Sequence, residues 1–201
     1  SYAYVALWNG ASWDSLNTRG ALGDVYDILP YDNALVIAGT FTRMDTLNNV
    51  GGVARWDGTQ WRRIGAPSTF TTPAFVSLAT DGGALIAAGS FDSTSTVRSK
   101  RIAAWNGSTW SAWGASDPGG SIFTTTFFQG KLLVGGNFGL RQIPQGGLAD
   151  TLASNIKKMD CSTSSANALM VLNGQLIVGG NFNQAGPVPA LSLANWSGTA
   201  W

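Results

Sequence analysis

An all-β fold built from repeated antiparallel sheets is predicted for this chain by three observations. First, the six residues 105–110, Trp-Asn-Gly-Ser-Thr-Trp, recur with small changes at three other places. Second, a short apolar run followed by Gly, a polar residue and Phe occurs four times. Third, successive copies of this run begin 50, 47 and 44 residues apart. Internal periods of this length with strand-type units are typical of the blades of a β-propeller.

The Trp motif is predicted to form a β-hairpin with one Trp on each arm. Its other copies are residues 8–13, 56–61 and 196–201. Each copy places Asn, Asp or Ser and then Gly between the two Trp residues, and Asn/Asp-Gly tolerates the positive φ of a type I′ turn. Because eight of the nine Trp residues lie at these repeated positions, we expect them to pack in the core between units.

The apolar run is predicted to be the second strand of each unit. Its copies begin at Leu35, Leu85, Leu132 and Leu176. Short continuous apolar runs indicate strands covered on both faces. Another strand-like segment and a turn precede each run, at residues 25–31, 75–79, 122–128 and 168–172. These segments would be the innermost strands, and the Trp hairpins would supply the third and fourth strands.

The whole chain, residues 1–201, is predicted to be a single propeller segment. It comprises an outer hairpin at 1–16 and blades at about 22–66, 74–114, 121–163 and 167–201. The third blade would carry a degenerate hairpin at residues 156–161, with Met159 in the first Trp position, after a loop at 139–155. Four inner strand pairs against five outer hairpins lead us to expect that the segment is part of a larger ring.

The motifs resemble the repeats of kelch and galactose-oxidase-like propellers. They are still closer to the W-(D/N)-G-x-x-W repeats of secreted bacterial proteins and of fungal cell-surface cortical marker proteins, and the resemblance covers essentially the whole chain. It implies a propeller located outside the cell or at its surface. The copper site of galactose oxidase is not implied, because the chain has no His and its four Tyr residues all precede residue 32, far from Cys161.

The composition argues against several function classes. The 12 Lys and Arg residues nearly balance 11 acidic residues, all of them Asp, so no basic field attracts nucleic acid. No apolar run is long enough for membrane insertion. The absence of His and Glu removes the commonest general base and metal ligand. We therefore expect a non-enzymatic protein without a cofactor or metal. The single Cys161 is either unpaired or bonded to another chain.

Candidate site residues lie mainly in turns and loops. Asn106 and Asn195 begin Asn-x-Ser sequons, the acceptor sequence for N-glycosylation. The loops predicted at 42–52, 92–101, 139–155 and 183–192 open on one face and vary in length, and binding residues are common on such loops. The first two are the most charged, so we predict partner contacts at Arg43, Asp45, Arg98, Lys100 and Arg101. Trp113 lies outside the repeat and is the predicted exposed aromatic contact.

Two functions follow as hypotheses. The first is a structural or interaction propeller of a secreted or cell-surface assembly, whose partners are the remaining propeller blades or neighbouring subunits. The alternative is a glycan-binding or glycan-processing propeller. Exposed aromatic side chains and paired carboxylates converging on the loop face would favour the alternative, whereas Asp24 and Asp27 at the rim of an inner strand are expected to serve turns and loops.

Overall fold

All regular structure in the described residues is β-structure, which confirms that the fold is all-β. The computed structural model describes residues 5–16, 20–65, 74–91, 101–114, 117–145, 150–151, 156–157 and 164–201, the two short pieces by their backbone alone. Every strand pair in this part is antiparallel, and it contains no helix. We therefore find no helix in these segments that is long and apolar enough to cross a membrane.

Four larger sheets follow one another along the chain. Sheet 1 consists of β4 (Val25–Tyr31), β5 (Ala34–Gly39), β8 (Val53–Trp56) and β9 (Trp61–Arg63). Sheet 2 consists of β10 (Phe75–Thr80), β11 (Leu85–Gly89), β12 (Ile102–Trp105) and β13 (Trp110–Ala112). Sheet 3 consists of β14 (Ile122–Phe128), β15 (Lys131–Gly136), β16 (Gly139–Ile143) and β17 (Asp150–Thr151). Sheet 4 consists of β19 (Ser165–Leu172), β20 (Gln175–Asn181) and β23 (Leu193–Trp196).

Three small sheets accompany them. The N-terminal hairpin pairs β1 (Ala6–Trp8) with β2 (Trp13–Ser15). One three-stranded sheet contains β3 (Ala21–Leu22), β6 (Arg43–Met44) and β7 (Leu47–Asn48). The other contains β18 (Ile156–Lys157), β21 (Gln184–Ala185) and β22 (Val188–Pro189). Two of the predicted loops, 42–52 and 183–192, are therefore short hairpins that each pair with a strand from earlier in the chain.

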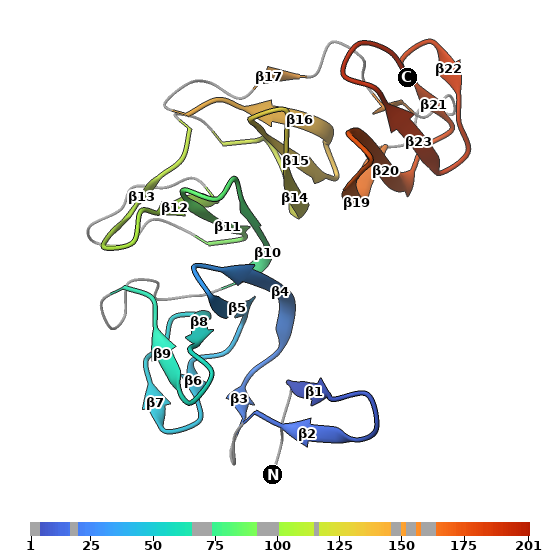
Figure 1. The fold of residues 1–201 in the computed structure, drawn as a ribbon. Coiled ribbons are helices and arrows are strands. Elements are labelled where there is room, and N and C mark those ends of the chain that lie inside the picture. Colours follow the sequence, from blue (N-terminus) through green and yellow to red (C-terminus); the bar gives the residue numbers. More distant parts are fainter. Residues whose placement is uncertain are drawn as a thin grey trace.

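The sheets stand side by side in an arc, with their first strands on its inner side (Figure 1). β4 contacts β10, β10 contacts β14, and β14 contacts β19. Later strands of each sheet lie progressively farther out, and the N-terminal hairpin and sheet 4 are at opposite ends of the arc (Figure 1). Each interior sheet is thus covered on both faces, which explains its continuous apolar second strand.

A Gly at the end of each second strand, or one residue before it in β20, is required by a close approach of the backbone. A Cβ at Gly39, Gly89, Gly136 or Gly180 would lie between 1.9 and 2.2 Å from the carbonyl oxygen of the residue before the first strand or at its start. The register of each first pair also shifts by one residue nearby, between Val25 and Asp27 in sheet 1 and at the matching place in the others. The repeated Gly therefore marks the same bulged pair four times.

The core lies between successive sheets. One cluster joins sheets 1 and 2 through residues such as Val36 and Ala87, a second joins sheets 2 and 3, and a third joins sheets 3 and 4. A fourth cluster lies on the face of sheet 1 that points away from sheet 2, where residues of the β3–β6–β7 sheet cover it. Adjacent residues of one strand point into different clusters, as Ile86 and Ala87 of β11 do.

The outer half of sheet 3 differs from the prediction. β16 pairs directly with β15, and Gly136 opposes Gly139 across a two-residue turn. Gly139 has a φ of +86°, which lets the chain reverse at once, and Leu140 and Ile143 then enter the core. The interpretation of 139–155 as a loop before a degenerate hairpin is therefore wrong, and β18 instead pairs with β21. Met159 and Cys161 lie outside the described residues.

Candidate interaction surfaces

The turn of each Trp hairpin is closed by a side chain. Asn106 Oδ1 accepts hydrogen bonds from the amides of Ser108 and Thr109, at 3.0 and 2.9 Å. Asn9, Asp57 and Ser197 accept the equivalent bonds in the other copies. Only the Gly of each turn has a positive φ, so the predicted type I′ turn is wrong here. In sheets 1, 3 and 4 the turn between the first and second strands does have a positive φ at both central residues, as at Gln129-Gly130.

The four Trp pairs have one geometry. Their ring centroids are 5.3 to 5.5 Å apart and their planes are inclined by 50 to 53°. In the three hairpins whose two arms are both strands, the two Trp residues are the last paired residues before the turn, as Trp105 and Trp110 are. The motif therefore determines the pair locally, whatever lies next to it.

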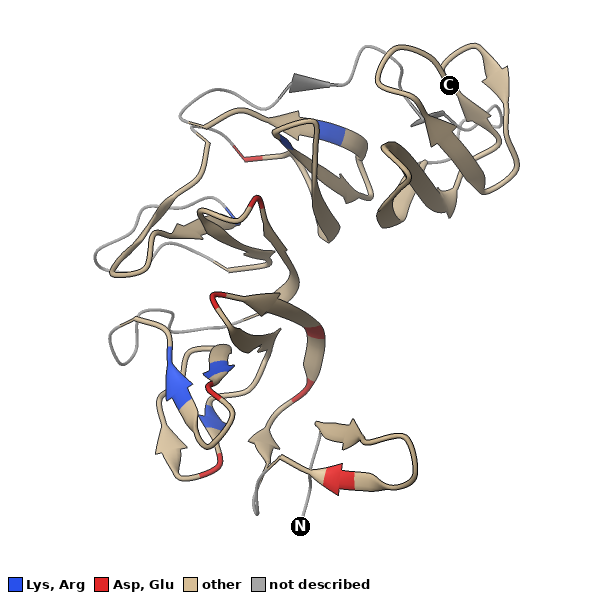
Figure 2. Ribbon diagram, in the orientation of Figure 1, with Lys and Arg blue, Asp and Glu red and all other residues tan. Residues whose placement is uncertain are grey.

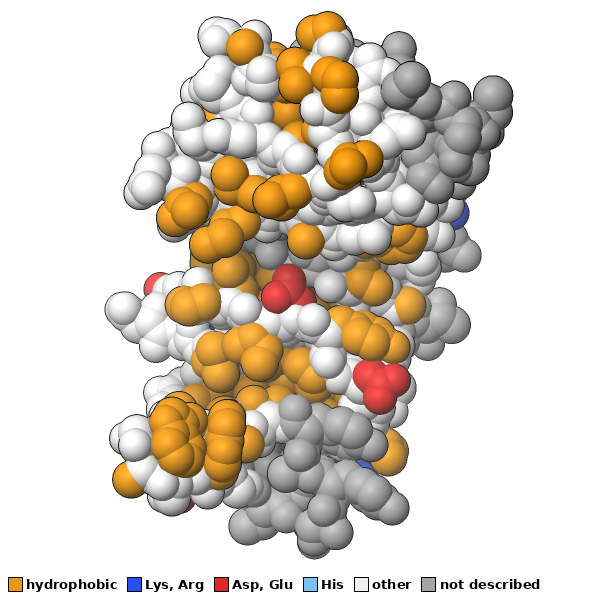
Figure 3. Space-filling view, turned by 90° about the vertical axis from the view of Figure 1, so that its right-hand side faces the viewer, with side chains coloured by type: hydrophobic (Ala, Val, Ile, Leu, Met, Phe, Trp, Pro, Cys, Tyr) orange, Lys and Arg blue, Asp and Glu red, His pale blue; other side chains and the backbone are white. Residues whose placement is uncertain are grey.

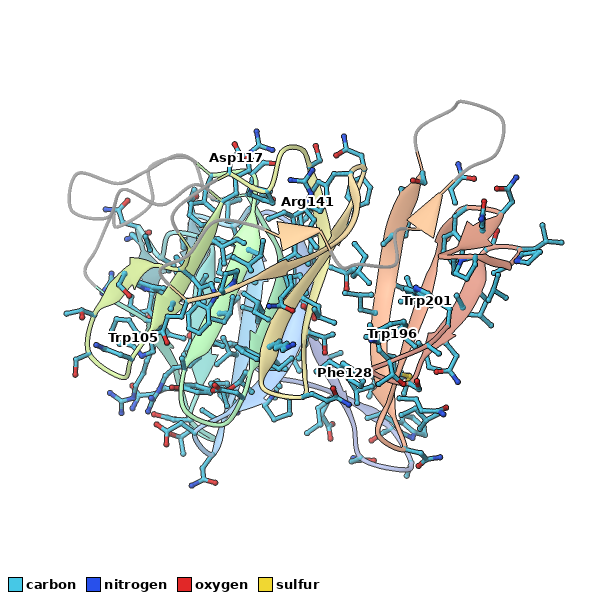
Figure 4. The ribbon with its side chains drawn as sticks, turned by 90° about the horizontal axis from the view of Figure 1, so that it is seen from above. Trp105, Asp117, Phe128, Arg141, Trp196 and Trp201 are labelled. Carbon is cyan, nitrogen blue, oxygen red and sulfur yellow. The ribbon has the colours of Figure 1, made fainter. Side chains whose placement is uncertain are left out.

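In sheets 2 and 4 the Trp pair packs against the preceding sheet. Trp110 is buried among residues of sheet 1, and its indole Nε1 donates a hydrogen bond of 2.9 Å to the carbonyl of Ile64. In sheet 4, Trp196 and Trp201 pack with Phe128 of sheet 3 (Figure 4). The predicted role of these Trp residues as inter-sheet packing is confirmed at both places.

The N-terminal hairpin exposes its Trp pair. Trp8 is 50% and Trp13 is 70% exposed. Among the described residues β1 pairs with β2 alone, whereas β8, β12 and β23 pair with β5, β11 and β20, the second strands of their sheets. Trp61, by contrast, is buried in the cluster beside sheet 1, although its indole nitrogen has no hydrogen-bond partner. In the described residues the hairpin is therefore a two-stranded sheet whose Trp pair is open to solvent.

The opposite end of the array is also uncovered. The face of sheet 4 that points away from sheet 3 carries Met170, Leu172 and Leu193, all exposed. By pairing register, Leu193 opposite Gly179 corresponds to Val53 opposite Ala38, and Val53 is only 1% exposed. Figure 3 shows hydrophobic side chains at the lower and upper parts of the molecular face in view and also across its middle. Large apolar side chains in such patches mark interaction surfaces.

Charged side chains of the described residues are concentrated in and beside sheet 1 (Figure 2). Lys and Arg of the described residues gather on β6, β8 and β9 (Figure 2). Arg43 and Asp45, two predicted contacts, are half-buried, and Arg43 Nε and Asp45 Oδ1 are enclosed without a hydrogen-bond partner. Both residues lie in the β6–β7 hairpin, and Arg63 of β9 holds this hairpin by donating to the carbonyl of Asn48. Arg98 and Lys100 lie outside the described residues.

Arg101 and Trp113, also predicted contacts, hold neighbouring sheets together. The Arg101 guanidinium donates to the carbonyl of Gly120 and lies 3.4 Å from the Asp117 carboxylate. Trp113 is partly buried, donates its indole N–H to the carbonyl of Ile143 at 3.1 Å, and packs edge-on against Phe127. The expectation of an exposed Trp113 is wrong, because sheet 3 brings no Trp pair of its own to this interface.

The two sequon residues differ in their surroundings. Asn106 is exposed, and it accepts the hydrogen bonds of the turn through Oδ1, whereas a glycan would be carried by Nδ2. Asn195 is exposed on β23, and its Nδ2 donates a bond of 2.6 Å to Gln175 Oε1. Asn195 pairs with Ile177, which places it on the same open face of sheet 4 as Met170.

The first strands surround a cavity of about 410 Å³ that was not predicted from the sequence. Polar groups of its lining form hydrogen bonds between neighbouring sheets. Asp27 of sheet 1 accepts from the amide of Leu78 of sheet 2 at 2.6 Å, and Ser77 of sheet 2 accepts from the amide of Thr125 of sheet 3 at 2.9 Å. Asp27 also accepts from the amide of Ile28. Asp27 is the one ionisable residue among those that line the cavity, whereas glycoside hydrolysis uses two carboxyl groups.

Shifted pKa values are found at Asp57, Asp81 and Tyr31. The pKa of Asp57 is lowered, first by the hydrogen bond from Arg62 and then by those from Gln60 and Thr59. The amides of Gly83 and Ala84 lower the pKa of Asp81. Burial, with Asp32 and Asp81 nearby, raises the pKa of Tyr31. Within the described segments, no group of three potential ligands could hold a metal ion. The shifts of Asp57 and Asp81 follow from hydrogen bonds made within their own turns.

Comparison with known proteins identifies a fold and no family. No protein-family model and no curated protein sequence matches the chain. A crystal structure from B. thetaiotaomicron, the extracellular domain of a protein assigned to the hybrid two-component systems, is similar, with a TM-score of 0.60 and 14% sequence identity. The match covers 87% of this chain and 22% of that one. At this identity the similarity concerns the fold alone.

Proposed function

We propose that this chain is a non-catalytic structural module, a segment of an extracellular or cell-surface β-propeller that holds an assembly together. The observation that carries the proposal is the contrast between equivalent faces. Between sheets these faces are buried, whereas at the two ends of the array they expose Trp13 and Leu193. Large apolar side chains at both ends fit a protein whose end faces are covered by further blades or by neighbouring subunits.

The propeller and its location rest on several supports. The four sheets follow one another with their first strands innermost, the repeat period is typical of propeller blades, and the similar fold from B. thetaiotaomicron belongs to an extracellular domain. The use of Arg101 and Trp113 in bonds between sheets also favours a structural role over a loop-face catalytic site.

Hydrogen exchange tests this proposal in the protein purified in its native assembly and in the isolated 201-residue chain. We expect the amides of β1, β20 and β23 to exchange slowly in the assembly and faster in the isolated chain, while those of β11 are slow in both. Equal exchange of the end strands in both samples would contradict the proposal.

A glycan-binding propeller is the second candidate, favoured by the exposed Trp8 and Trp13 rings, since aromatic faces can stack on sugar rings, and by the hydroxyl groups that line the cavity. A glycan array distinguishes the two. Specific binding that is lost in Trp13→Ala would favour this candidate, and the structural proposal expects none.

A further inference from the structure

The two ends of the array carry complementary surfaces. We propose that the Trp8–Trp13 hairpin of one copy of this chain packs on the open face of sheet 4 of a second copy. This inference rests on the proposed function, because it names the partner of the same end faces. The association is head-to-tail, so each copy keeps one hairpin and one open face available.

The same kind of interface occurs twice inside the chain, where a Trp pair packs on the preceding sheet. Trp110 of sheet 2 packs against Val53 and Ile64 of sheet 1 in one buried cluster, with its indole N–H on the Ile64 carbonyl. Trp196 packs against sheet 3 in the same sense. In both cases the Trp pair covers the face of the preceding sheet that points toward the C-terminal end of the array.

Sheet 4 presents that same face without a cover. Ile177 corresponds by register to Val36, and Leu193 corresponds to Val53. Val36 and Val53 are buried beneath sheet 2, whereas Leu193 is 64% exposed and Met170 beside Ile177 is 57% exposed. The face has the apolar character that a Trp pair covers elsewhere in the chain.

The hairpin supplies the matching surface. The other Trp pairs each contribute to a buried cluster, as Trp61 and Trp110 do, and Trp8 and Trp13 are left open in the described part of the chain. Their arrangement is already that of the buried pairs, with centroids 5.4 Å apart, so binding requires little ordering of the two rings.

Charge favours this contact as well. The three strands of sheet 4 contain no charged residue. On β1 and β2 the one charged residue, Asp14, already accepts a bond of 2.8 Å from Asn9 Nδ2. Joining the two surfaces therefore buries apolar area without stripping water from an unpaired charge.

Sedimentation velocity with matched variants tests the inference. Leu193→Asp blocks the sheet 4 face, Trp13→Asp blocks the hairpin, and Val188→Asp adds the same charge at an exposed apolar residue of the separate β21–β22 hairpin. All three sites are exposed, so circular dichroism and thermal melting are expected to show folded proteins. The unmodified chain and Val188→Asp should associate with rising concentration, and each blocking variant should weaken association by about tenfold or more.

Mixing the two blocking variants gives the decisive result. Each retains one intact surface, so an equimolar mixture should form a 1:1 heterodimer although each variant alone is monomeric. A monomeric unmodified chain at high micromolar concentration, or a mixture that stays monomeric, would overturn the inference. The exchange experiment on the native assembly then separates the two ideas, because protected end strands would retain the structural proposal with a different partner.

Discussion

The hairpins β1–β2 and β12–β13 carry nearly the same six residues and differ in what lies beside them. Both have a side-chain cap on the turn, and their Trp rings are 5.4 and 5.5 Å apart. Yet Trp110 is buried against sheet 1, while Trp13 is open to solvent. The comparison shows that the motif encodes the hairpin, and that the neighbouring sheet determines how much the Trp pair contributes to stability.

Removing one Trp from each hairpin should give the largest difference. Trp110→Ala creates a cavity between sheets 1 and 2 and removes the bond to Ile64, so we expect a loss of about 3–5 kcal/mol in the free energy of unfolding. Trp13→Ala should cost less than about 1 kcal/mol in the monomeric chain. Urea unfolding at low protein concentration measures both, and equal losses would break the comparison.

The two adjacent glycines Gly179 and Gly180 of sheet 4 differ in the space available for a side chain. A Cβ at Gly180 would lie 2.0 Å from the Ser165 carbonyl oxygen, whereas one at Gly179 would first meet Ala168 Cβ at 3.8 Å. Gly180→Ala should therefore destabilise the chain by roughly 2–3 kcal/mol. Gly179→Ala should change stability by less than about 1 kcal/mol in thermal unfolding. Similar effects of the two substitutions would show that the strand end is not tightly packed.

The hydrogen bonds between inner strands should contribute less to the free energy of unfolding than the packing of Trp110. Ser77→Ala leaves the buried amide of Thr125 without its acceptor, which we expect to cost about 1–3 kcal/mol in urea unfolding. Ser111→Ala, on the exposed part of β13, is the matched control and should change stability by less than about 0.5 kcal/mol. An effect at Ser77 no larger than the control would exclude this bond as a link between sheets 2 and 3.

The smallest effect should come from the turn of the β8–β9 hairpin. Because the pKa of Asp57 is lowered in the folded state, its stabilisation is complete above the pKa of unfolded Asp, about 3.9, and is lost as the pH falls below it. Asp57→Asn keeps an acceptor for the turn, as Asn106 does, but does not titrate. The unmodified chain should lose stability more steeply than this variant between about pH 5 and 2. Parallel curves would contradict this.

The parts of the fold that were predicted from the sequence are those that depend on local patterns. The Trp hairpins, the inner strand pairs and the Gly at the end of each second strand follow from turn residues and apolar runs. Sheet 3 was predicted incorrectly beyond β15. The chain reverses at Gly139 without a Trp motif nearby, and Met159 lies near the position where the first Trp of a hairpin was expected.

Roles that depend on a neighbouring sheet could not be predicted. Trp113 lies outside the repeat, and its place at the interface follows only from the carbonyl of Ile143, which is 30 residues away in sequence. Asp27 was correctly placed on an inner strand, but its bond to Leu78 joins two different sheets. Arg101 was predicted as a partner contact from loop charge alone, which does not reveal the nearby Gly120 carbonyl and Asp117.

Hydroxyl-radical footprinting of individual Trp residues tests the central claim most directly, that the neighbouring sheet determines the burial of each Trp pair. In the isolated chain at low concentration, Trp8 and Trp13 should be oxidised rapidly while Trp61 and Trp110 are protected. In the native assembly all four should be protected. Oxidation of Trp13 that is equally rapid in the assembly would contradict the claim that the end faces are covered there.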